Sequence, residues 1–443
     1  MEEKNLNLTH ILVIPYPAQG HMIPILDLTH HLAATGLFTV TVVVTPKNLP
    51  ILSPLLSSHS LPISPLVLPF PADSGIPAGA ENTKDLPPAS FRPMMFALSK
   101  LQDPLHRWFS SLSSPPVAVI SDIFCGWTHR FASELGIKSL VFSPSGAMAL
   151  SVIYSLWRDM PKEEDCKNGD VLFSAVPNSP KYPWWQLSPV YRSYVEGEDI
   201  SEFIKEGFRD DMASWGLVIN SFDALERVYL RHLMSVLGHQ RVWAVGPLVP
   251  PEEKAILTGD QMEAVGGALE KSGVRFIWCA REPKTSEHKE SGHGRVPPGF
   301  EDRTASRGVV IKEWAPQVAI LNHPAVGTFL THCGWNSVLE GLMAGVELLA
   351  WPMGADQFSN ATLLVDQLNI GVRVCEGASA IPNPNDLAGA LADSVSPGHV
   401  ERRKRILKLR NDALEAVKEN GSSSKEMHGL VNTLNELRTK PQA

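Results

Sequence analysis

Short apolar runs, rich in β-branched residues, alternate with helical patterns along most of the chain, and this alternation limits the folds that it can adopt. Residues 10–15 and 38–45 are two such runs, and between them apolar side chains recur at helical spacing over 22–34. Strands that alternate with helices form a mostly parallel, doubly wound sheet. Four further runs continue the pattern, at 117–120, 140–142, 217–219 and 242–244.

The run Val-Gly-Pro-Leu-Val-Pro-Pro at 245–251 is the best candidate for a linker, because its prolines interrupt helices and strands alike. Beyond it the pattern starts again, with apolar runs at 274–280, 309–311, 325–330, 348–351 and 371–374. The chain has 443 residues, which is enough for two or three domains of ordinary size. We therefore predict an α/β protein with two doubly wound units.

The composition excludes several classes of protein. Lys and Arg number 39 against 47 Asp and Glu, so the net charge of −8 indicates no surface for nucleic acid or an anionic membrane. A basic run at 402–410 is interrupted by Ile406 and Leu407, which favours an amphipathic surface helix. The five cysteines are scattered, the first ten residues do not resemble a signal peptide, and no apolar run reaches the ~18–20 residues of a membrane span. We expect a soluble, cytoplasmic protein without a disulfide framework or a structural zinc site.

Two polar residues follow predicted strands in the first half, His21 after 10–15 and Asp122 after 117–120. The carboxyl ends of parallel strands share one edge of a sheet, where ligands bind in such folds. A neutral imidazole at a helix N-terminus can act as a general base, and a buried Asp can fix its tautomer. Each residue taken alone could equally be a helix cap. No G-x-S-x-G sequence or reactive-cysteine context accompanies them, which argues against a hydrolase triad.

Polar segments also follow three predicted strands in the second half, at 314–317, 331–337 and 351–357. Trp314 offers a flat face on which a base could stack. His332 and Ser337 lie where a helix would begin, and the backbone N–H groups of a helix N-terminus suit a pyrophosphate. Structural explanations compete with these roles. The sequence from Ser337 to Glu340 matches a helix capping box, and Asp356 could be only an N-cap.

Residues 314–357 read WAPQVAILNHPAVGTFLTHCGWNSVLEGLMAGVELLAWPMGADQ, and this window of 44 residues closely resembles the signature box of the plant secondary-metabolite UDP-glycosyltransferases, including those that act on flavonoids and phenols. Further matches lie outside it, so that the resemblance covers nearly the whole chain: 17–24 (PAQGHMIP), 121–128 (SDIFCGWT), 220–226 (NSFDALE) and 246–248 (GPL). The resemblance implies the GT-B fold, in which two Rossmann-like domains face a cleft. The implied domains are 1–246 for the acceptor, 247–424 for the UDP-sugar, and 425–443 as a C-terminal helix that returns to the first domain.

The resemblance also implies roles for individual residues. His21 would deprotonate the acceptor hydroxyl, Asp122 would orient His21, and the oxygen would attack the anomeric carbon with inversion, without a metal or a cofactor. The implied donor contacts are Trp314 and Ala315 at uracil, Gln317 and Glu340 at the ribose, His332, Asn336 and Ser337 at the phosphates, and Trp335, Asp356 and Gln357 at the sugar, with Ser143 or Ser145 also reaching the sugar. Gln357, at the last position of the box, favours UDP-glucose over UDP-galactose as the donor.

The implied partners are UDP-glucose and a small phenolic or flavonoid acceptor, with no nucleic acid, and we expect the protein to act as a monomer. Apolar and aromatic side chains that would suit such an acceptor are Phe91, Met94, Met95, Trp184 and Trp185. Plain packing in the core explains each of these five residues at least as well.

The sequence departs from the family pattern at two places. Family members usually have proline where this chain has Glu347, and we expect that side chain to be exposed to solvent. Between Leu248 and Leu257, relatives carry a Trp-Leu-Asp turn, a strand and a Ser-Phe-Gly-Ser-type loop, whereas this chain has only the eight residues VPPEEKAI. The absent strand is normally the first of the second sheet and a central one. We therefore predict a second domain that is gapped, repaired by re-pairing of its neighbours, or unstable.

Two functions compete on these grounds. The first is an inverting UDP-glucosyltransferase that acts on small phenols. The second is a catalytically impaired or inactive variant that retains partial binding of nucleotide or aglycone, because the absent loop normally approaches the donor phosphates. An NAD-dependent oxidoreductase would fit the sheet pattern, but no G-x-G-x-x-G follows any predicted strand.

Overall fold

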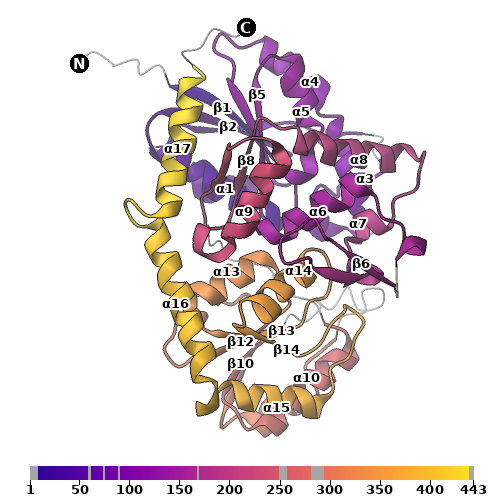
Figure 1. Ribbon diagram of the computed structural model, residues 1–443, viewed down its shortest axis with the longest axis vertical. Helices are drawn as coiled ribbons and strands as arrows, with labels where there is room; N and C mark the ends of the chain where they lie inside the picture. The colour runs from indigo at the N-terminus through magenta and orange to yellow at the C-terminus, as the bar shows by residue number, and fades with distance from the viewer. Residues whose placement is uncertain are drawn as a thin grey trace. The chain divides into compact units, whose positions relative to one another are not determined.

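The computed structural model describes residues 8–57, 61–72, 75–87, 90–166, 169–248, 257–280 and 294–438. The chain divides into two compact units, of which unit 1 comprises Met1–Pro250 and Glu415–Ala443, and unit 2 comprises Pro251–Leu414. Figure 1 traces the helices and strands of both. Within the described residues, none of the helices is both long enough and apolar enough to cross a membrane.

Unit 1 is built on a seven-stranded sheet in the order β3-β2-β1-β4-β5-β8-β9, with every neighbouring pair parallel. Six strands lie where the apolar runs predict them. The sequence did not indicate β3, which contains Pro65 and stands at the edge of the sheet, where a missing N–H is tolerated. The strands are β1 (Thr9–Ile14), β2 (Phe38–Val44), β3 (Ile63–Val67), β4 (Ala118–Asp122), β5 (Lys138–Ser143), β8 (Gly216–Ile219) and β9 (Val242–Ala244).

Helix α1 (Gln19–Ala34) shows how the sequence pattern builds the core of unit 1. Met22, Ile25, Leu28 and Leu32, which recur at helical spacing, are all buried against the sheet's central strands. The other helices of the first 250 residues are α2 (Ser53–Leu56), α3 (Phe91–Ser99), α4 (Gln102–Ser110), α5 (Thr128–Glu134), α6 (Ala147–Asp159), α7 (Pro189–Arg192), α8 (Asp199–Met212) and α9 (Asp223–Leu237). A short antiparallel hairpin, β6 (Asp170–Leu172) with β7 (Lys181–Pro183), completes this part.

The last helix, α17 (Ser422–Glu436), belongs to unit 1 although it comes from the far end of the chain (Figure 1). Leu430, Val431 and Leu434 are buried in the same hydrophobic cluster as β1 and β2. The Thr9 hydroxyl donates a hydrogen bond of 2.8 Å to Oδ1 of Asn435. The end of the chain therefore stabilises the N-terminal sheet.

Unit 2 has a divided sheet in its described residues. One part pairs β10 (Phe276–Cys279) with β11 (Gly308–Ile311), and the other has the order β12-β13-β14. All pairs are parallel. The remaining elements are β12 (Thr328–Thr331), β13 (Glu347–Ala350), β14 (Gly371–Arg373), α10 (Gly259–Ser272), α11 (Phe300–Thr304), α12 (Gln317–Leu321), α13 (Trp335–Ala344), α14 (Gln357–Ala361), α15 (Pro384–Ser394) and α16 (Val400–Val417).

A cavity of about 750 Å³ lies between the two parts of this sheet. Its lining includes residues of β10 on one side and of β12 on the other, with apolar side chains from α10, α12 and α15. The short junction at 249–256 itself lies outside the described residues. Of the outcomes predicted for the absent strand, the described residues show a gap rather than a re-paired sheet.

Glu347 contradicts the expectation that it is exposed. Its side chain is fully buried at the start of β13. Nη1 of Arg402 donates to Glu347 Oε1, and Nδ1 of His399 lies 3.2 Å from the same oxygen. Burying a carboxylate is costly unless it is paired, and both partners come from the segment that begins α16. The Glu347 carboxylate is therefore stabilised by an ion pair and not by exposure to solvent.

The basic run at 402–410 forms part of α16, as the sequence predicts. Ile406 is buried, and Leu407 is 46% exposed, so the helix has an apolar side and a solvated side. Arg403 donates to the carbonyl oxygen of Ser394, and Arg410 donates to that of Met343. These two arginines thus bind carbonyl groups at the C-terminal ends of α15 and α13, where the helix dipole favours a cation.

Candidate functional site

His21 and Asp122 meet at the carboxyl edge of the first sheet. β1 and β4 are neighbours, His21 is the third residue of the helix that follows β1, and Asp122 is the last residue of β4. Nδ1 of His21 lies 2.9 Å from Oδ2 of Asp122. The other carboxylate oxygen accepts the Phe124 N–H at 2.9 Å, so Asp122 also caps the turn that follows it. The Asp122 carboxylate therefore both caps this turn and binds His21.

The pair fixes the chemistry of the imidazole. The Asp122 side chain is fully buried, and a carboxylate can only accept hydrogen bonds, so Nδ1 of His21 carries the proton. Nε2 is then the nitrogen whose lone pair can take a proton. The His21 side chain is 19% exposed, which leaves it reachable by a small molecule. This arrangement can perform general-base chemistry on a bound hydroxyl.

An aromatic group surrounds His21. Phe124 stacks on the imidazole with ring centroids 4.8 Å apart, and Tyr16 meets it edge-on at 5.6 Å. Phe91, one of the predicted acceptor residues, lies 5.5 Å from Tyr16 and 5.9 Å from Phe124. Sequence reasoning missed Tyr16 and Phe124, although each stands two residues after the end of a strand, β1 and β4 respectively.

The other four predicted acceptor residues lie in varied surroundings. Met94 and Met95 are buried in α3 and pack as core residues. Trp184 contacts Tyr191 at a centroid distance of 6.0 Å, and Trp185 is 46% exposed. Core packing therefore describes the two methionines, whereas Phe91 has ring contacts with the group around His21.

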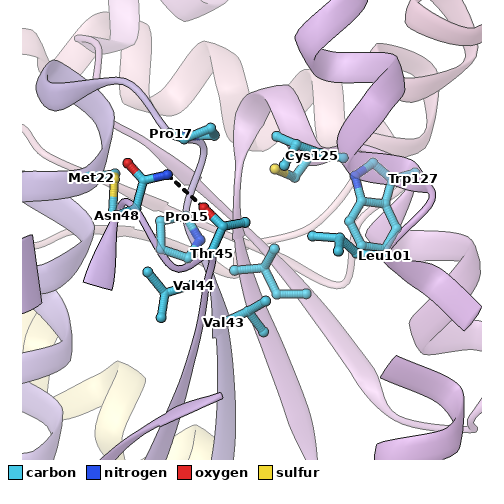
Figure 2. A pocket seen from close by; sticks show the side chains of 12 residues that line it. Pro15, Pro17, Met22, Val43, Val44, Thr45, Asn48, Leu101, Cys125 and Trp127 are labelled. Carbon is cyan, nitrogen blue, oxygen red and sulfur yellow. Dashed lines mark hydrogen bonds between the residues drawn. The ribbon is translucent and has the colours of Figure 1, made fainter. Parts of the chain in front are cut away.

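Figure 2 shows a small cavity at the same edge of the sheet, lined by Pro15, Pro17 and Met22 on one side and by Cys125 and Trp127 on the other. The amide of Asn48 donates to the Thr45 hydroxyl at 2.8 Å within it. Its volume of about 20 Å³ suits one water molecule and is far below the several hundred Å³ that a drug-sized ligand needs. The cavity is therefore not an acceptor pocket.

A second buried histidine–aspartate pair lies in unit 1. Nε2 of His129 is 2.9 Å from Oδ1 of Asp211, and both side chains are nearly inaccessible. Burial lowers the pKa of His129 to about 4 and raises the pKa of Asp211 well above its usual value. Both directions favour a neutral pair, with the proton on the carboxyl group. Inaccessibility gives this pair a structural role, in contrast to His21 and Asp122.

The serines of the 143–146 turn lie elsewhere on the same edge. Ser143 ends β5, is fully buried, and donates its hydroxyl hydrogen bond to the carbonyl oxygen of Ser145 at 3.0 Å. Ser145 is partly exposed. The structure therefore ties the Ser143 hydroxyl to its own turn and leaves Ser145 as the more accessible of the two.

In unit 2, the predicted uracil and ribose residues form a connected group. Trp314 is 78% exposed, so its ring has a face open for stacking, while Ala315 beside it is buried. Gln317 begins α12, and its side-chain amide donates to Glu340 Oε2 at 2.6 Å. Glu340 is only 2% exposed. A carboxylate held in this way accepts further hydrogen bonds in a fixed direction, as a pair of ribose hydroxyls requires.

His332, Asn336 and Ser337 lie at the N-terminal end of α13. The capping-box explanation for Ser337 and Glu340 is wrong, because α13 begins at Trp335 and its N-cap is Gly334. Gly334 itself has no side chain that could cap this turn, and the N-terminal end of a helix is a position that binds anions. Burial lowers the pKa of His332, with a smaller opposing effect of Asp356, so its imidazole is neutral at pH 7 and can donate one hydrogen bond.

The loop before α14 presents Asp356 and Gln357. Oε1 of Gln357 accepts the N–H groups of Met353 and Gly354 at 2.9 and 3.0 Å, which directs its NH₂ group away from the loop. Asp356 occupies the N-cap position of α14 but makes no capping hydrogen bond. Its Oδ2 instead accepts from Asn360 at 3.1 Å.

Asn360 is a residue that sequence reasoning missed. Its amide nitrogen also donates to the carbonyl oxygen of Cys333 at 2.9 Å, so one side chain joins the loop before α13 to Asp356. The backbone of Cys333 has φ = 63°, an unusual value for a residue with a side chain. Trp335 is buried next to this turn. The predicted phosphate and sugar residues are therefore held together by a buried asparagine.

The large cavity of unit 2 reaches these residues. His332, Ser337 and Gln317 belong to its lining together with the two strand edges. The gap in the sheet thus opens directly behind the predicted phosphate contacts. Among the described side chains, no group of three or more His, Cys, Asp or Glu is placed to hold a metal ion.

The sequence of this chain is similar to those of known proteins. Residues 252–392 match the family model described as UDP-glucoronosyl and UDP-glucosyl transferase. UDP-glycosyltransferase 89B2 of Stevia rebaudiana is 53% identical, over 96% of this chain and 98% of its own. The flavonol 3-O-glucosyltransferase UGT89B1 of Arabidopsis thaliana is 48% identical, over 96% of this chain and 95% of its own.

The alignments also show that this chain is shorter than both relatives. The alignment with the Stevia protein spans 460 positions, and 96% of 443 residues fill about 425 of them, which leaves about 35 positions that only the relative occupies. The same proportions hold for the Arabidopsis protein. Both relatives therefore contain residues that have no counterpart here, and the position of the difference at the junction between Leu248 and Leu257 stays a prediction.

Crystal structures of Arabidopsis thaliana UGT89C1 have the same fold. With UDP-L-rhamnose bound, that protein superposes with a TM-score of 0.77 at 37% identity, over 96% of this chain and 99% of the other. Its complexes with UDP and with quercetin give 0.75 and 0.76. The expectation of two Rossmann-like units is confirmed. The chain belongs to the plant secondary-metabolite UDP-glycosyltransferases, with the GT-B fold.

Proposed function

We propose that this chain transfers glucose from UDP-glucose to a hydroxyl of a small phenolic or flavonoid acceptor, with inversion at the anomeric carbon. The observation that carries the proposal is the 2.9 Å contact between His21 and the buried Asp122 beneath an aromatic group. The names of the relatives support the substrate classes, since UGT89B1 is a flavonol 3-O-glucosyltransferase and UGT89C1 was crystallised with quercetin.

The geometry of unit 1 supports the following proposal for the acceptor side of the reaction. The ring of a phenol would pack against the partly exposed Phe124 and Phe91, which the buried Tyr16 contacts from inside, with its hydroxyl at Nε2 of His21. His21 takes the proton as the oxygen bonds to the anomeric carbon and the bond from that carbon to the UDP oxygen breaks. Asp122 stabilises the imidazolium that forms, because it is buried and hydrogen-bonded to Nδ1.

The donor side rests on the groups gathered around α13. We propose that Trp314 stacks on uracil beside the Ala315 backbone, and that the Gln317–Glu340 pair binds the ribose. The leaving UDP gains negative charge, which the first turn of α13 can stabilise without a metal ion. Here the phosphates would contact His332, Asn336 and Ser337. The sugar would contact Trp335, Asp356 and Gln357, with Ser145 rather than Ser143 as a further candidate.

We propose glucose as the donor sugar, and rhamnose is the alternative donor. Gln357 at the last position of the signature box favours glucose, and UGT89B1 is a glucosyltransferase. In contrast, UGT89C1 was crystallised with UDP-L-rhamnose, and a flavonol 7-O-rhamnosyltransferase of Arabidopsis is 38% identical to this chain. Transfer with both donors at equal concentration decides between them.

The proposal is tested with the purified full chain, the two UDP-sugars, and a panel of flavonols and hydroxybenzoates. We expect a glucoside whose anomeric configuration is inverted relative to the donor, and loss of transfer in His21→Ala. The matched control is His31→Ala, at the exposed C-terminal end of the same helix, which keeps wild-type turnover. Transfer that persists in His21→Ala contradicts the assigned base.

An impaired or inactive chain is the second candidate, and the divided sheet is the observation that favours it. The cavity removes packing behind His332 and Ser337. In contrast, the comparisons do not favour an inactive chain, since the relatives named above are glycosyltransferases. A folded chain that binds UDP but forms no glycoside with either donor would establish this alternative. A glycoside formed with the dependence on His21 described above, at a rate typical of the family, excludes it.

A further inference from the structure

Two glycines bring the backbone of the turn after Asp122 into direct contact with helix α8. Gly126 follows the 3₁₀ turn Ile123–Cys125, and Gly207 lies within α8. A Cβ atom at position 126 would lie 2.3–2.6 Å from three backbone atoms of Gly207. Carbon atoms in ordinary contact are about 3.5–4.0 Å apart, so a side chain at position 126 would push the turn and α8 apart by about 1 Å.

Only the lack of space requires glycine at position 126. The backbone of Gly126 has φ = −54° and ψ = −26°, values that any residue adopts. The contact is not symmetric. A Cβ atom at Gly207 would meet the Cα of Gly126 at 3.7 Å and would have no closer neighbour among the described residues. Alanine therefore fits at position 207 and not at position 126.

Helix α8 is held firmly by its neighbours, so it cannot easily retreat from the turn. It packs against α3, α5 and α6 (Figure 1). Phe208 stacks on the fully buried Trp157 of α6, with ring centroids 5.0 Å apart. Nε2 of His129, in α5, lies 2.9 Å from Oδ1 of Asp211, in α8. The turn is a single short element, and a forced separation would therefore displace the turn more than the helix.

The turn carries Phe124, whose ring covers the imidazole of His21. These two rings stack with their centroids 4.8 Å apart and their planes at 27°. The Phe124 N–H donates to Asp122, and Phe208 of α8 meets the Phe124 ring edge-on at 6.2 Å. Both the turn and α8 therefore determine where the Phe124 ring lies.

The stacked ring affects His21 in two ways. It restricts rotation of the imidazole, which must keep Nδ1 directed at Asp122 if Nε2 is to accept a proton. The face of an aromatic ring also attracts a cation, and His21 becomes a cation when it takes up the proton. Displacing Phe124 would therefore weaken the base at the moment of transfer.

We propose that Gly126 is a positioning residue for the base, because its lack of a side chain lets α8 press on the turn and hold Phe124 over His21. The kinetic part of this inference rests on the proposed function. A misplacement of about 1 Å can lower a rate about 10²-fold, and we expect that loss of kcat in Gly126→Ala. UDP affinity should not change, because the residues proposed to bind UDP lie in unit 2.

The first measurement reports the ring stack itself and needs no substrate. The full chain is labelled with ¹³C at the imidazole Cε1 of histidine, and the NMR signal of His21 is assigned by its loss in His21→Ala. Phe124→Leu gives the position of this signal without the ring current of Phe124. We expect the signal in Gly126→Ala to move toward that position, and the signal in Gly207→Ala to stay at the wild-type position.

The second measurement is steady-state transfer from UDP-glucose to a flavonol. Gly207→Ala is the matched control, since it makes the same chemical change on the other side of the contact and should keep the wild-type kcat. Adding Gly126→Ala to Phe124→Leu should lower kcat little further than Phe124→Leu alone, because both changes act through the same ring.

Circular dichroism establishes that each variant folds. If Gly126→Ala does not fold, Phe208→Leu takes its place, because it removes the ring that supports Phe124 from α8 and adds no atom at the contact. We expect Phe208→Leu to change the His21 signal and kcat in the same direction as Gly126→Ala, by smaller amounts.

Three results would overturn the proposal. The first is an unmoved His21 signal in folded Gly126→Ala, or in Phe208→Leu where that variant replaces it. The second is an equal loss of kcat in Gly207→Ala. The third is a full further loss of kcat when Gly126→Ala is added to Phe124→Leu. A wild-type chain that transfers no sugar would contradict the proposed function instead, while the His21 signal would still decide whether Gly126 positions Phe124.

Discussion

Replacing Asp122 by asparagine changes the proton on His21 and little else. The carboxylate accepts two hydrogen bonds, from Nδ1 of His21 and from the Phe124 N–H, both at 2.9 Å. In Asp122→Asn, the amide oxygen can keep the Phe124 N–H, so the NH₂ group faces Nδ1. Nδ1 must then accept, the proton moves to Nε2, and the nitrogen that faces the acceptor has no lone pair for its proton.

The size of the effect follows from the charge that is lost. When His21 takes up a proton, its imidazolium lies about 4 Å from a buried carboxylate, which is worth about 4 kcal/mol at an effective dielectric constant of 20. At about 1.4 kcal/mol for each factor of ten in rate, Asp122→Asn should lower kcat about 10³-fold. This value lies within the range of about 10²–10⁴ for general acid–base catalysis. Binding of UDP should not change, because the donor residues lie in unit 2.

The measurement is steady-state transfer from UDP-glucose to a flavonol, with UDP affinity determined by calorimetry on the same preparations. Asp210→Asn is a matched control, since Asp210 is partly exposed and pairs with Arg130 at the surface. A variant Asp122→Asn with kcat within tenfold of the wild type would refute the assignment of His21 as the base. An equal loss in Asp210→Asn would show that the effect is not specific.

Three further predictions concern other parts of the chain. Trp314→Ala should weaken UDP binding about fivefold to 150-fold in calorimetry, the equivalent of one base stack of about 1–3 kcal/mol. Glu347→Gln should lower the free energy of unfolding in urea by about 1.5–3 kcal/mol, because it removes the charge partner of the partly exposed Arg402, and adding Arg402→Met should recover part of the loss. Asp211→Asn should make the free energy of unfolding depend on pH. The pKa of the buried His129 is about 4, against 6.5 for an ordinary histidine. As the pH falls from 6.5 to 4, the unfolded chain therefore takes up a proton at His129 that the folded chain does not. In the wild type the raised pKa of Asp211 offsets this uptake, so the variant should lose up to about 1.4 kcal/mol per pH unit relative to the wild type in urea unfolding.

The helices and strands that could be predicted are those whose formation depends on residues close together in the sequence. Runs such as Phe38–Val44 contain enough β-branched residues to mark a buried strand, and Met22 to Leu32 repeat with the period of a helix. Topology then brings His21 and Asp122 together, because strands that end at one edge of a parallel sheet place the following residues side by side. The gap in the second sheet was predictable because it depends on the number of residues between two landmarks, Leu248 and Leu257.

The features that were missed depend on partners distant in sequence. Whether Glu347 is exposed depends on Arg402, which lies 55 positions later, and nothing near Glu347 reveals it. Asn360 joins two loops through the carbonyl oxygen of Cys333, a contact that no sequence pattern encodes. The capping box was misjudged for a different reason: the motif at Ser337 was present, but the helix had already begun at Trp335. A sequence motif shows that a segment could form a capping box, whereas the residue at which the helix begins depends on the conformation of the preceding turn.

The divided sheet can coexist with an ordered donor region because the core of unit 2 does not depend on the absent strand alone. One hydrophobic cluster contains Trp278 of β10, Val265 of α10, Leu387 of α15 and Trp351 after β13, so side chains bridge the two parts of the sheet. The unpaired backbone groups would each cost about 1–3 kcal/mol if they were dry, but a cavity of about 750 Å³ has room for water that can satisfy them. What the gap removes is packing behind the residues that face it. Gln357 and Asp356 are fixed by their own loop and by Asn360, whereas His332 and Ser337 line the cavity. Loss of the strand should therefore weaken the hold on the phosphates before it affects recognition of the sugar.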